Sequence, residues 1–98
     1  MTNKTEETAH SRFEVQVEEG PGHGDLYELE QTTYYRVVER SSGQVVLRFE
    51  GELSASFSGG QWRDYEYSGV RGVTLAADER SVHVTYAGGY EEDVPLPE

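Results

Sequence analysis

The strictest constraint on the fold is an alternation of apolar and polar side chains from Val45 to Phe57. One side of this segment consists of Val45, Leu47, Phe49, Gly51, Leu53, Ala55 and Phe57. The other side consists of Val46, Arg48, Glu50, Glu52, Ser54, Ser56 and Ser58. A helix would scatter these positions around its axis, so the spacing predicts a long strand with one apolar and one solvated face.

Turn residues before this segment predict the strand that pairs with it. Ser41–Gly43 has the length of a three-residue hairpin loop, with glycine at the position that adopts a left-handed conformation. The register that keeps apolar residues on one side places Val37 opposite Leu47 and Tyr35 opposite Phe49. The same register also gives the pairs Thr33–Gly51, Gln31–Leu53, Leu29–Ala55 and Tyr27–Phe57.

Three further turns predict antiparallel hairpins along the rest of the chain, at 59–61, 78–80 and 87–89. The expected pairs are Ala55–Tyr65, Leu53–Tyr67, Gly51–Gly69, Ala77–Val82, Leu75–Val84, Val73–Tyr86, Tyr86–Tyr90 and Val82–Val94. Pro95 and Pro97 then end the ladder, because proline has no amide proton to donate.

These segments predict an all-β fold, an antiparallel meander of about seven strands over residues 12–98, after a disordered tail at 1–11. No segment has the pattern of an amphipathic helix, so the sheet must cover its own apolar face. It would do so by closing into a small barrel or a two-layer sandwich, with a sharp bend where Thr33, Gly51 and Gly69 align. A face-to-face dimer is the other way to cover that face.

The amino-acid composition of the chain limits the kinds of molecule that it is expected to bind. The chain has 98 residues, no cysteine and a net charge of −11, which argues against binding to nucleic acid, because phosphates require clustered lysine and arginine. A less favoured interpretation of the same negative charge is that the protein mimics nucleic acid and occupies the basic groove of a DNA-binding protein. No apolar run is long enough to span a membrane or to form a signal peptide, so we expect a soluble, cytoplasmic protein.

Motifs for catalysis or cofactors are weak. The stretch Gly20–Gly24 lacks the lysine and hydroxyl residue of a phosphate-binding loop and is interpreted as a flexible connector. His10, His23 and His83 have no predicted set of metal ligands around them. No serine, histidine and aspartate share a predicted location. The sequence therefore predicts no catalytic, metal or cofactor site and a protein that is not an enzyme.

The outward side of the first long hairpin is the predicted interaction patch. Its register places Arg36 opposite Arg48 and Val38 opposite Val46, beside Tyr34, on an otherwise acidic surface. Exposed valine, tyrosine and arginine side chains are typical of contact surfaces. Trp62 is also expected to face outward and to add a second anchor.

The inward side offers the alternative of a ligand cavity. Tyrosines 27, 35, 65, 67, 86 and 90 are all expected to face inward. A barrel lined by Tyr27, Gln31, Thr33, Tyr35, Tyr65, Tyr67 and Tyr86 would bind a small apolar or aromatic molecule. Tyrosines packed into a solid core are the simpler interpretation.

The sequence therefore favours a small, acidic, non-catalytic β domain that acts through contacts with an unknown protein or with a second copy of itself. A tyrosine-lined barrel that binds a small ligand is the alternative.

Overall fold

The computed structural model describes residues 11–24 and 27–97, apart from the side chain of His23, and their regular structure is entirely β. The predicted tail at 1–11, except Ser11, lies outside the described residues. The strands are β1 (Phe13–Glu19), β2 (His23–Gly24), β3 (Glu28–Glu39), β4 (Val45–Ser58), β5 (Gln61–Leu75), β6 (Ser81–Tyr86) and β7 (Glu91–Pro95). The alternation from Val45 to Phe57 is confirmed as one long strand, β4.

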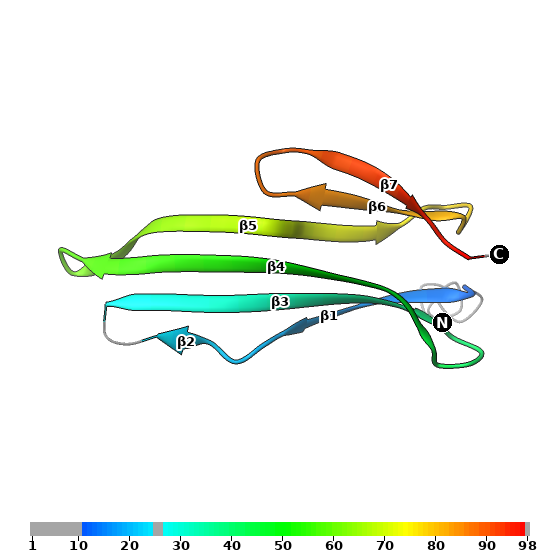
Figure 1. Cartoon of the computed structure of the whole chain (residues 1–98), viewed down its shortest axis with the longest axis horizontal. Coiled ribbons are helices and arrows are strands. Elements are labelled where there is room, and N and C mark those ends of the chain that lie inside the picture. The colour runs from blue at the N-terminus through cyan, green and yellow to red at the C-terminus, as the bar shows by residue number, and fades with distance from the viewer. Residues whose placement is uncertain (1–10, 25–26, 98) are drawn as a thin grey trace, which may run out of the picture.

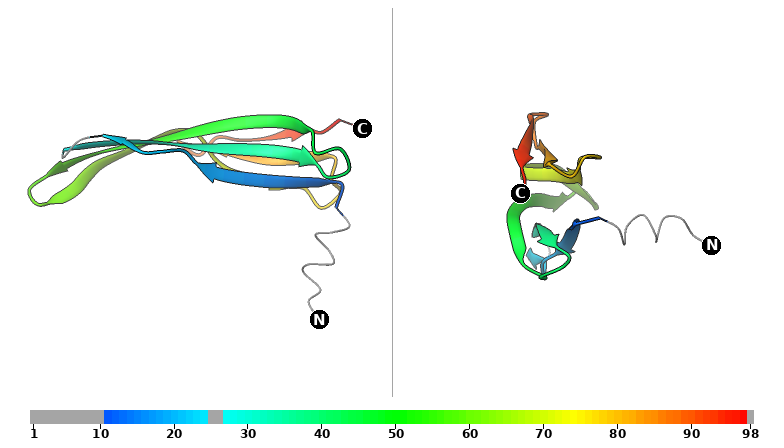
Figure 2. Two further views of the ribbon diagram at one scale, coloured as in Figure 1. Left: turned by 90° about the horizontal axis from the view of Figure 1, so that it is seen from below. Right: turned by 90° about the vertical axis from the view of Figure 1, so that its right-hand side faces the viewer.

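Six of these strands form an antiparallel meander in the order β1-β3-β4-β5-β6-β7 (Figure 1). The two-residue β2 pairs with β3 beyond the end of β1. The sheet curves strongly, as Figure 2 shows, yet it is not closed, because the described parts of β1 and β7 share no ladder. The prediction of a closed barrel is not confirmed, since β1 and β7 are short and β7 ends at Pro95.

The core lies at one end of the molecule, where the curved sheet brings β1 and β3 over β5 and β6. Its buried residues are Phe13, Tyr35, Val37, Val70, Val73, Val82, Val84 and Leu96. One loop contact bridges the open side, where the Arg12 amide donates to Glu79 Oε1 at 2.8 Å. The Leu96 amide donates to the Arg80 carbonyl at 2.8 Å and extends the β6–β7 pairing beyond Pro95. We call this end the body.

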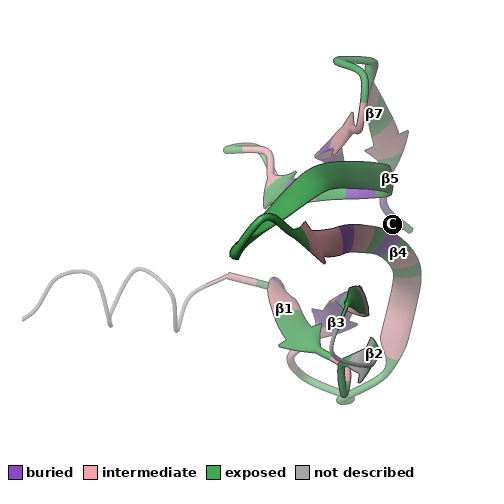
Figure 3. Ribbon diagram, turned by 90° about the vertical axis from the view of Figure 1, so that its left-hand side faces the viewer, coloured by how far each residue is buried: buried purple, intermediate pink, exposed green. Residues whose placement is uncertain are grey.

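The other end is an arm of three strands, formed by Glu28–Thr32 of β3, Glu52–Ser58 of β4 and Gln61–Ser68 of β5. Every residue of this β5 segment is exposed, and the only buried residue among the described ones of the arm is Ala55 (Figure 3). The arm gives the molecule its length of 49 Å against 31 and 24 Å in the other directions. We call the side of the sheet that continues into the core the inner face, and the opposite side the outer face.

The predicted register of the first hairpin is confirmed from Leu29–Ala55 through Val37–Leu47, with Arg36 opposite Arg48. It is wrong beside the turn, where a bulge after Val37 places Val38 opposite Val45 rather than Val46. The loop has one residue more than predicted, because the Glu39 amide bonds to Gln44, and the bulge compensates for it. Gly43 has the expected left-handed conformation, with φ of 75°.

In the second hairpin, the predicted pairs Leu53–Tyr67 and Gly51–Gly69 are confirmed, but the predicted turn is wrong. Gly59 and Gly60 both have positive φ and form a two-residue loop, which is the geometry that best fits the twist of a hairpin. Ser58 therefore pairs with Gln61 and Phe57 with Trp62. A bulge at Asp64, whose φ is 55°, restores the predicted register toward the body.

The third hairpin is shifted by two residues, whereas the fourth is as predicted. Leu75 pairs with Val82 rather than with Val84, because residues 77–80 form the loop and the Ala76 amide bonds to the Ser81 carbonyl. A shift of two keeps every side chain on its expected face. Val82 pairs with Val94 as predicted, and the Tyr86 amide donates to the Tyr90 carbonyl.

The predicted bend lies where the pairing partner of β5 changes from β4 to β6. Its ladder with β4 ends at Gly51–Gly69, and its ladder with β6 begins at Val70. Gly69 has φ of 72°, and a β-carbon on Gly51 would lie 1.9 Å from the Val70 carbonyl oxygen. Glycine at these two positions therefore lets the sheet turn over the core.

Candidate functional site

The inner face of the arm carries large apolar side chains that no other part of the described structure covers. Trp62 packs edge-on against Phe57, with ring centroids 5.3 Å apart, so it lies on the inner face and not on the outer face as expected. Tyr65 and Tyr67 are 54% and 44% exposed. The arm thus presents a row of aromatic rings to solvent along β5.

The expectation that the tyrosines fill an interior is therefore wrong for most of them. Tyr35 is buried and Tyr86 is half-buried, whereas Tyr27, Tyr65, Tyr67 and Tyr90 are exposed. The strand pairing that placed them on the apolar side is largely correct. The difference arises because the sheet covers its apolar face only in the body.

An open groove of about 310 Å³ lies at the root of the arm on the inner face. Its lining includes four of the seven residues predicted for a ligand cavity, namely Gln31, Thr33, Tyr35 and Tyr67. Tyr27, Tyr65 and Tyr86 are not part of it. The Arg71 guanidinium lies 3.6 Å from the centre of the Tyr67 ring, a cation–π contact beside the groove. These residues form a surface groove instead of an enclosed pocket.

The predicted interaction patch is divided by the structure. Tyr34, Arg36 and Arg48 line one open hollow of about 590 Å³ on the outer face, and Arg36 Nη2 lies 3.3 Å from Glu18 Oε1. Val38 is buried, and the half-buried Val46 packs against the core. With Trp62 on the inner face, the patch loses its apolar members and keeps a polar cluster around two arginines.

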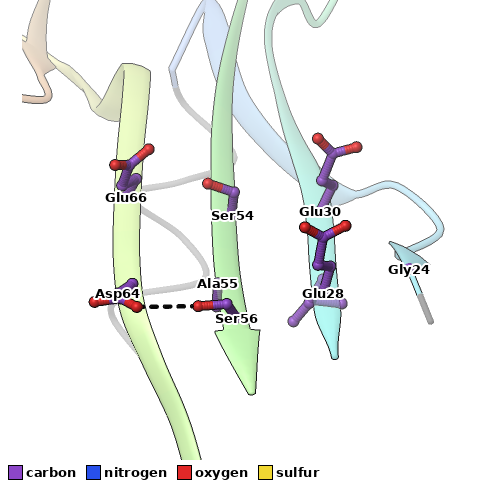
Figure 4. Close-up of a pocket in the computed structure, with 9 residues that line it drawn as sticks. Gly24, Glu28, Glu30, Ser54, Ala55, Ser56, Asp64 and Glu66 are labelled. Carbon is purple, nitrogen blue, oxygen red and sulfur yellow. Dashed lines mark hydrogen bonds between the residues drawn. The ribbon is translucent and has the colours of Figure 1, made fainter. Parts of the chain in front are cut away.

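The outer face of the arm is acidic. Glu28, Glu30, Asp64 and Glu66 surround a hollow of about 620 Å³ whose floor includes Ser54 and Ser56 (Figure 4). Ser56 Oγ donates to Asp64 Oδ2 at 3.1 Å and holds that carboxylate against β4. The two faces of the arm therefore differ sharply, with carboxylates on one side and aromatic rings on the other.

A small titratable cluster lies on the β6–β7 hairpin. His83 Nδ1 is 2.9 Å from Asp93 Oδ1, and His83 Nε2 is 2.5 Å from Glu91 Oε1. Hydrogen bonds to Asp93 and then to Glu91 raise the pKa of His83 above its ordinary 6.5. The predicted pairing of Val82 with Val94 places His83 opposite Asp93, so the strand register contains the signal for this contact. Within residues 11–24 and 27–97, no group of histidine and acidic residues is arranged to hold a metal ion.

We expect the His83→Gln variant to be less stable than the wild type at about pH 5.5 and to approach it as the pH rises. Because the folded-state pKa is raised, the ion pairs of His83 contribute fully below the unfolded pKa of 6.5. Their contribution is lost as the pH rises through the higher folded value. Denaturant unfolding across this range measures the difference, and the NMR titration of the His83 ring should have its midpoint above 6.5. A midpoint at or below that value would contradict the assignment.

Comparison of the chain with protein-family models, curated proteins and solved structures finds no match. The described part of the chain contains no helix of the length and apolarity needed to cross a membrane.

Proposed function

We propose that this protein is a non-catalytic acidic β domain that acts through protein contacts, and that the inner face of the arm is its contact surface. The observation that carries the proposal is the exposed row of Trp62, Tyr65 and Tyr67 on an extended arm. Aromatic enrichment and depletion of charge distinguish the centres of protein interfaces from the remaining surface. A cytoplasmic location, inferred from composition, is part of this proposal.

Electrostatics supports the inner face over the outer face. In a chain of net charge −11, the outer face of the arm would bring carboxylates together if it met another acidic surface. The inner face of the arm carries tyrosine, tryptophan, leucine and phenylalanine instead. Arg36 and Arg48 on the outer face of the body are the competing contact site, but their apolar neighbours Val38 and Val46 are not exposed there.

The double variant Tyr65→Ser, Tyr67→Ser tests the proposal. We expect the sedimentation coefficient of the wild type to rise with protein concentration, and the variant to sediment as a monomer throughout. Both tyrosines are largely exposed, so their loss should leave the circular dichroism spectrum and the unfolding midpoint close to those of the wild type.

The matched control replaces two residues on the other face of the same arm, Glu30→Ser with Glu52→Ser, and should associate like the wild type. A third variant, Arg36→Glu with Arg48→Glu, tests the competing site. Association that survives loss of the tyrosines but not reversal of the arginines would overturn the choice of surface. A wild type that stays monomeric at millimolar concentration would overturn self-association through the arm.

A further inference from the structure

The first half of β5 has a free edge. From Gln61 to Ser68, within the described residues, this strand has a ladder partner only on the β4 side. The β6–β7 hairpin covers the other side from Gly69 onward, where the Ala87 amide donates to the Gly69 carbonyl. Figure 1 shows β5 running well past the end of that hairpin. Unpaired backbone groups on such an edge can pair with another strand.

The outer edge of the sheet at β7 is protected against pairing more strongly than this edge. Three consecutive carboxylates, Glu91, Glu92 and Asp93, lie in β7, which ends at Pro95. Charged residues, proline and short length are the usual means by which edge strands avoid pairing. The free part of β5 also has three charged residues and a bulge, but it is longer than β7, has no proline and carries three aromatic residues. Its Asp64 carboxylate is held by Ser56 of β4 and does not stand alone at the edge.

This edge carries one cation and one anion besides Asp64, and the cation is hydrogen-bonded to the Gln61 side chain of its own strand. Arg63 and Glu66 both lie on the outer face, opposite Ser56 and Ser54 of β4. Within the described residues, neither forms an ion pair. The aromatic residues Trp62 and Tyr67 lie on the inner face, opposite Phe57 and Leu53. The edge therefore has an apolar pair on one face and a cation–anion pair on the other, separated by the bulge at Asp64.

We propose that the partner is a second copy of this chain, which adds its own β5 edge antiparallel to the first across a two-fold axis beside Tyr65. This deepens the proposed function and rests on it. Filling the free stretch from end to end places Gln61 opposite the partner's Ser68. The same register places Trp62 opposite the partner's Tyr67 and Arg63 opposite the partner's Glu66.

The bulge makes this register consistent with the two faces. In a regular strand, residues 62 and 67 would lie on opposite faces, because side chains alternate. The extra residue at Asp64 brings Trp62 and Tyr67 to the inner face and Arg63 and Glu66 to the outer face. Each copy then supplies one half of two aromatic pairs and two ion pairs, as an isologous interface requires.

The length of the free edge fits one partner strand. The Gly59–Gly60 turn of one copy would reach Gly69 of the other, where the β6–β7 hairpin begins to cover β5. Neither β6–β7 hairpin therefore overlaps the two paired β5 edges, which we call the seam. In a chain of net charge −11, contact between two acidic faces would bring carboxylates together, whereas this arrangement places the Arg63 of each copy against the Glu66 of the other. The seam is short, so we expect a dissociation constant in the micromolar range or weaker.

Charge reversal tests the pairing of Arg63 with Glu66. We expect Arg63→Glu or Glu66→Arg alone to raise the dissociation constant about tenfold, because each places like charges opposite each other twice. The double variant with the two charges exchanged should recover to within about threefold of the wild type. Equal dissociation constants for all four proteins, measured by sedimentation at low salt, would overturn the pairing.

Cysteine cross-linking tests the register. Because the chain has no native cysteine, only the introduced cysteines can form a disulfide. A mixture of the Gln61→Cys and Ser68→Cys chains should form an intermolecular disulfide on mild oxidation, because paired residues in a ladder lie within bridging distance. Neither chain alone should do so, and a mixture with Ser54→Cys in place of Ser68→Cys serves as the control.

Failure of this proposal is distinguishable from failure of the proposed function. If association still depends on Tyr65 and Tyr67 but the 61–68 mixture does not cross-link above the control, the edge geometry is wrong and the contact surface stands. If the wild type stays monomeric at millimolar concentration, the two-fold pairing is wrong and so is self-association through the arm. Cross-linking of the 61–68 mixture together with recovery in the charge exchange supports the two-fold seam.

Discussion

Replacement of Gly51 by alanine should destabilise the domain by more than about 3 kcal/mol, the range in which single substitutions act through a specific structural conflict. The new β-carbon would lie 1.9 Å from the Val70 carbonyl oxygen, a distance that real β-carbons do not reach. The obstacle is backbone, so it cannot move aside as the end of a flexible side chain can. Relief requires β4 and β5 to separate at the point where β5 changes partner.

Chemical denaturation followed by circular dichroism measures this effect, and Gly72→Ala provides the matched control. Gly72 lies in the same strand as Val70, no heavy atom lies within 4 Å of its hypothetical β-carbon, and its φ is not in the left-handed region. We expect its substitution to change the stability by less than about 1 kcal/mol. Similar losses for both variants would show that the close approach at Gly51 does not determine how the sheet turns.

The second large effect is expected at Phe13, the first residue of β1. Its side chain is 1% exposed and belongs to the core that β1 shares with β5 and β6. Phe13→Ala should cost about 3–5 kcal/mol, as is typical when a buried aromatic ring is removed and a cavity remains. Since a domain of this size has a total stability of only about 5–10 kcal/mol, the variant should be partly unfolded near physiological temperature.

Val17→Ala on the same strand is the control for Phe13→Ala. Val17 is 59% exposed, so its truncation should cost less than about 0.5 kcal/mol. Thermal unfolding of the two variants compares the buried start of β1 with its exposed end. Equal losses would contradict the placement of Phe13 in the packed core and of Val17 outside it.

The sequence was sufficient to predict the strands, since alternation and glycine-containing turns determine where each begins and which face is apolar. It correctly placed Arg36 opposite Arg48, Gly51 opposite Gly69 and Val82 opposite Val94. Bulges were not predictable, because an extra residue such as Asp64 leaves no mark on the composition of a strand. The bulge after Val37 is the reason why the Val38–Val46 pair was wrong.

The position of Trp62 was missed for a reason that the sequence does contain. Two adjacent glycines, Gly59 and Gly60, are a signal for a two-residue loop, and this loop places Trp62 beside Phe57. No comparable local signal in the sequence predicts that Tyr65 and Tyr67 are exposed. Alternation shows which side of a sheet is apolar, but whether another layer covers that side depends on the path of the whole chain.

The placement of Trp62 also determines what optical experiments on this protein report. It is the single indole of the chain, and it lies at the far end of the arm, beside Phe57 and away from the buried cluster around Phe13. Its fluorescence therefore senses the surroundings of the arm and not the integrity of the packed interior. An unchanged emission spectrum would be compatible with a loosened core, and a shifted one with a fully folded chain.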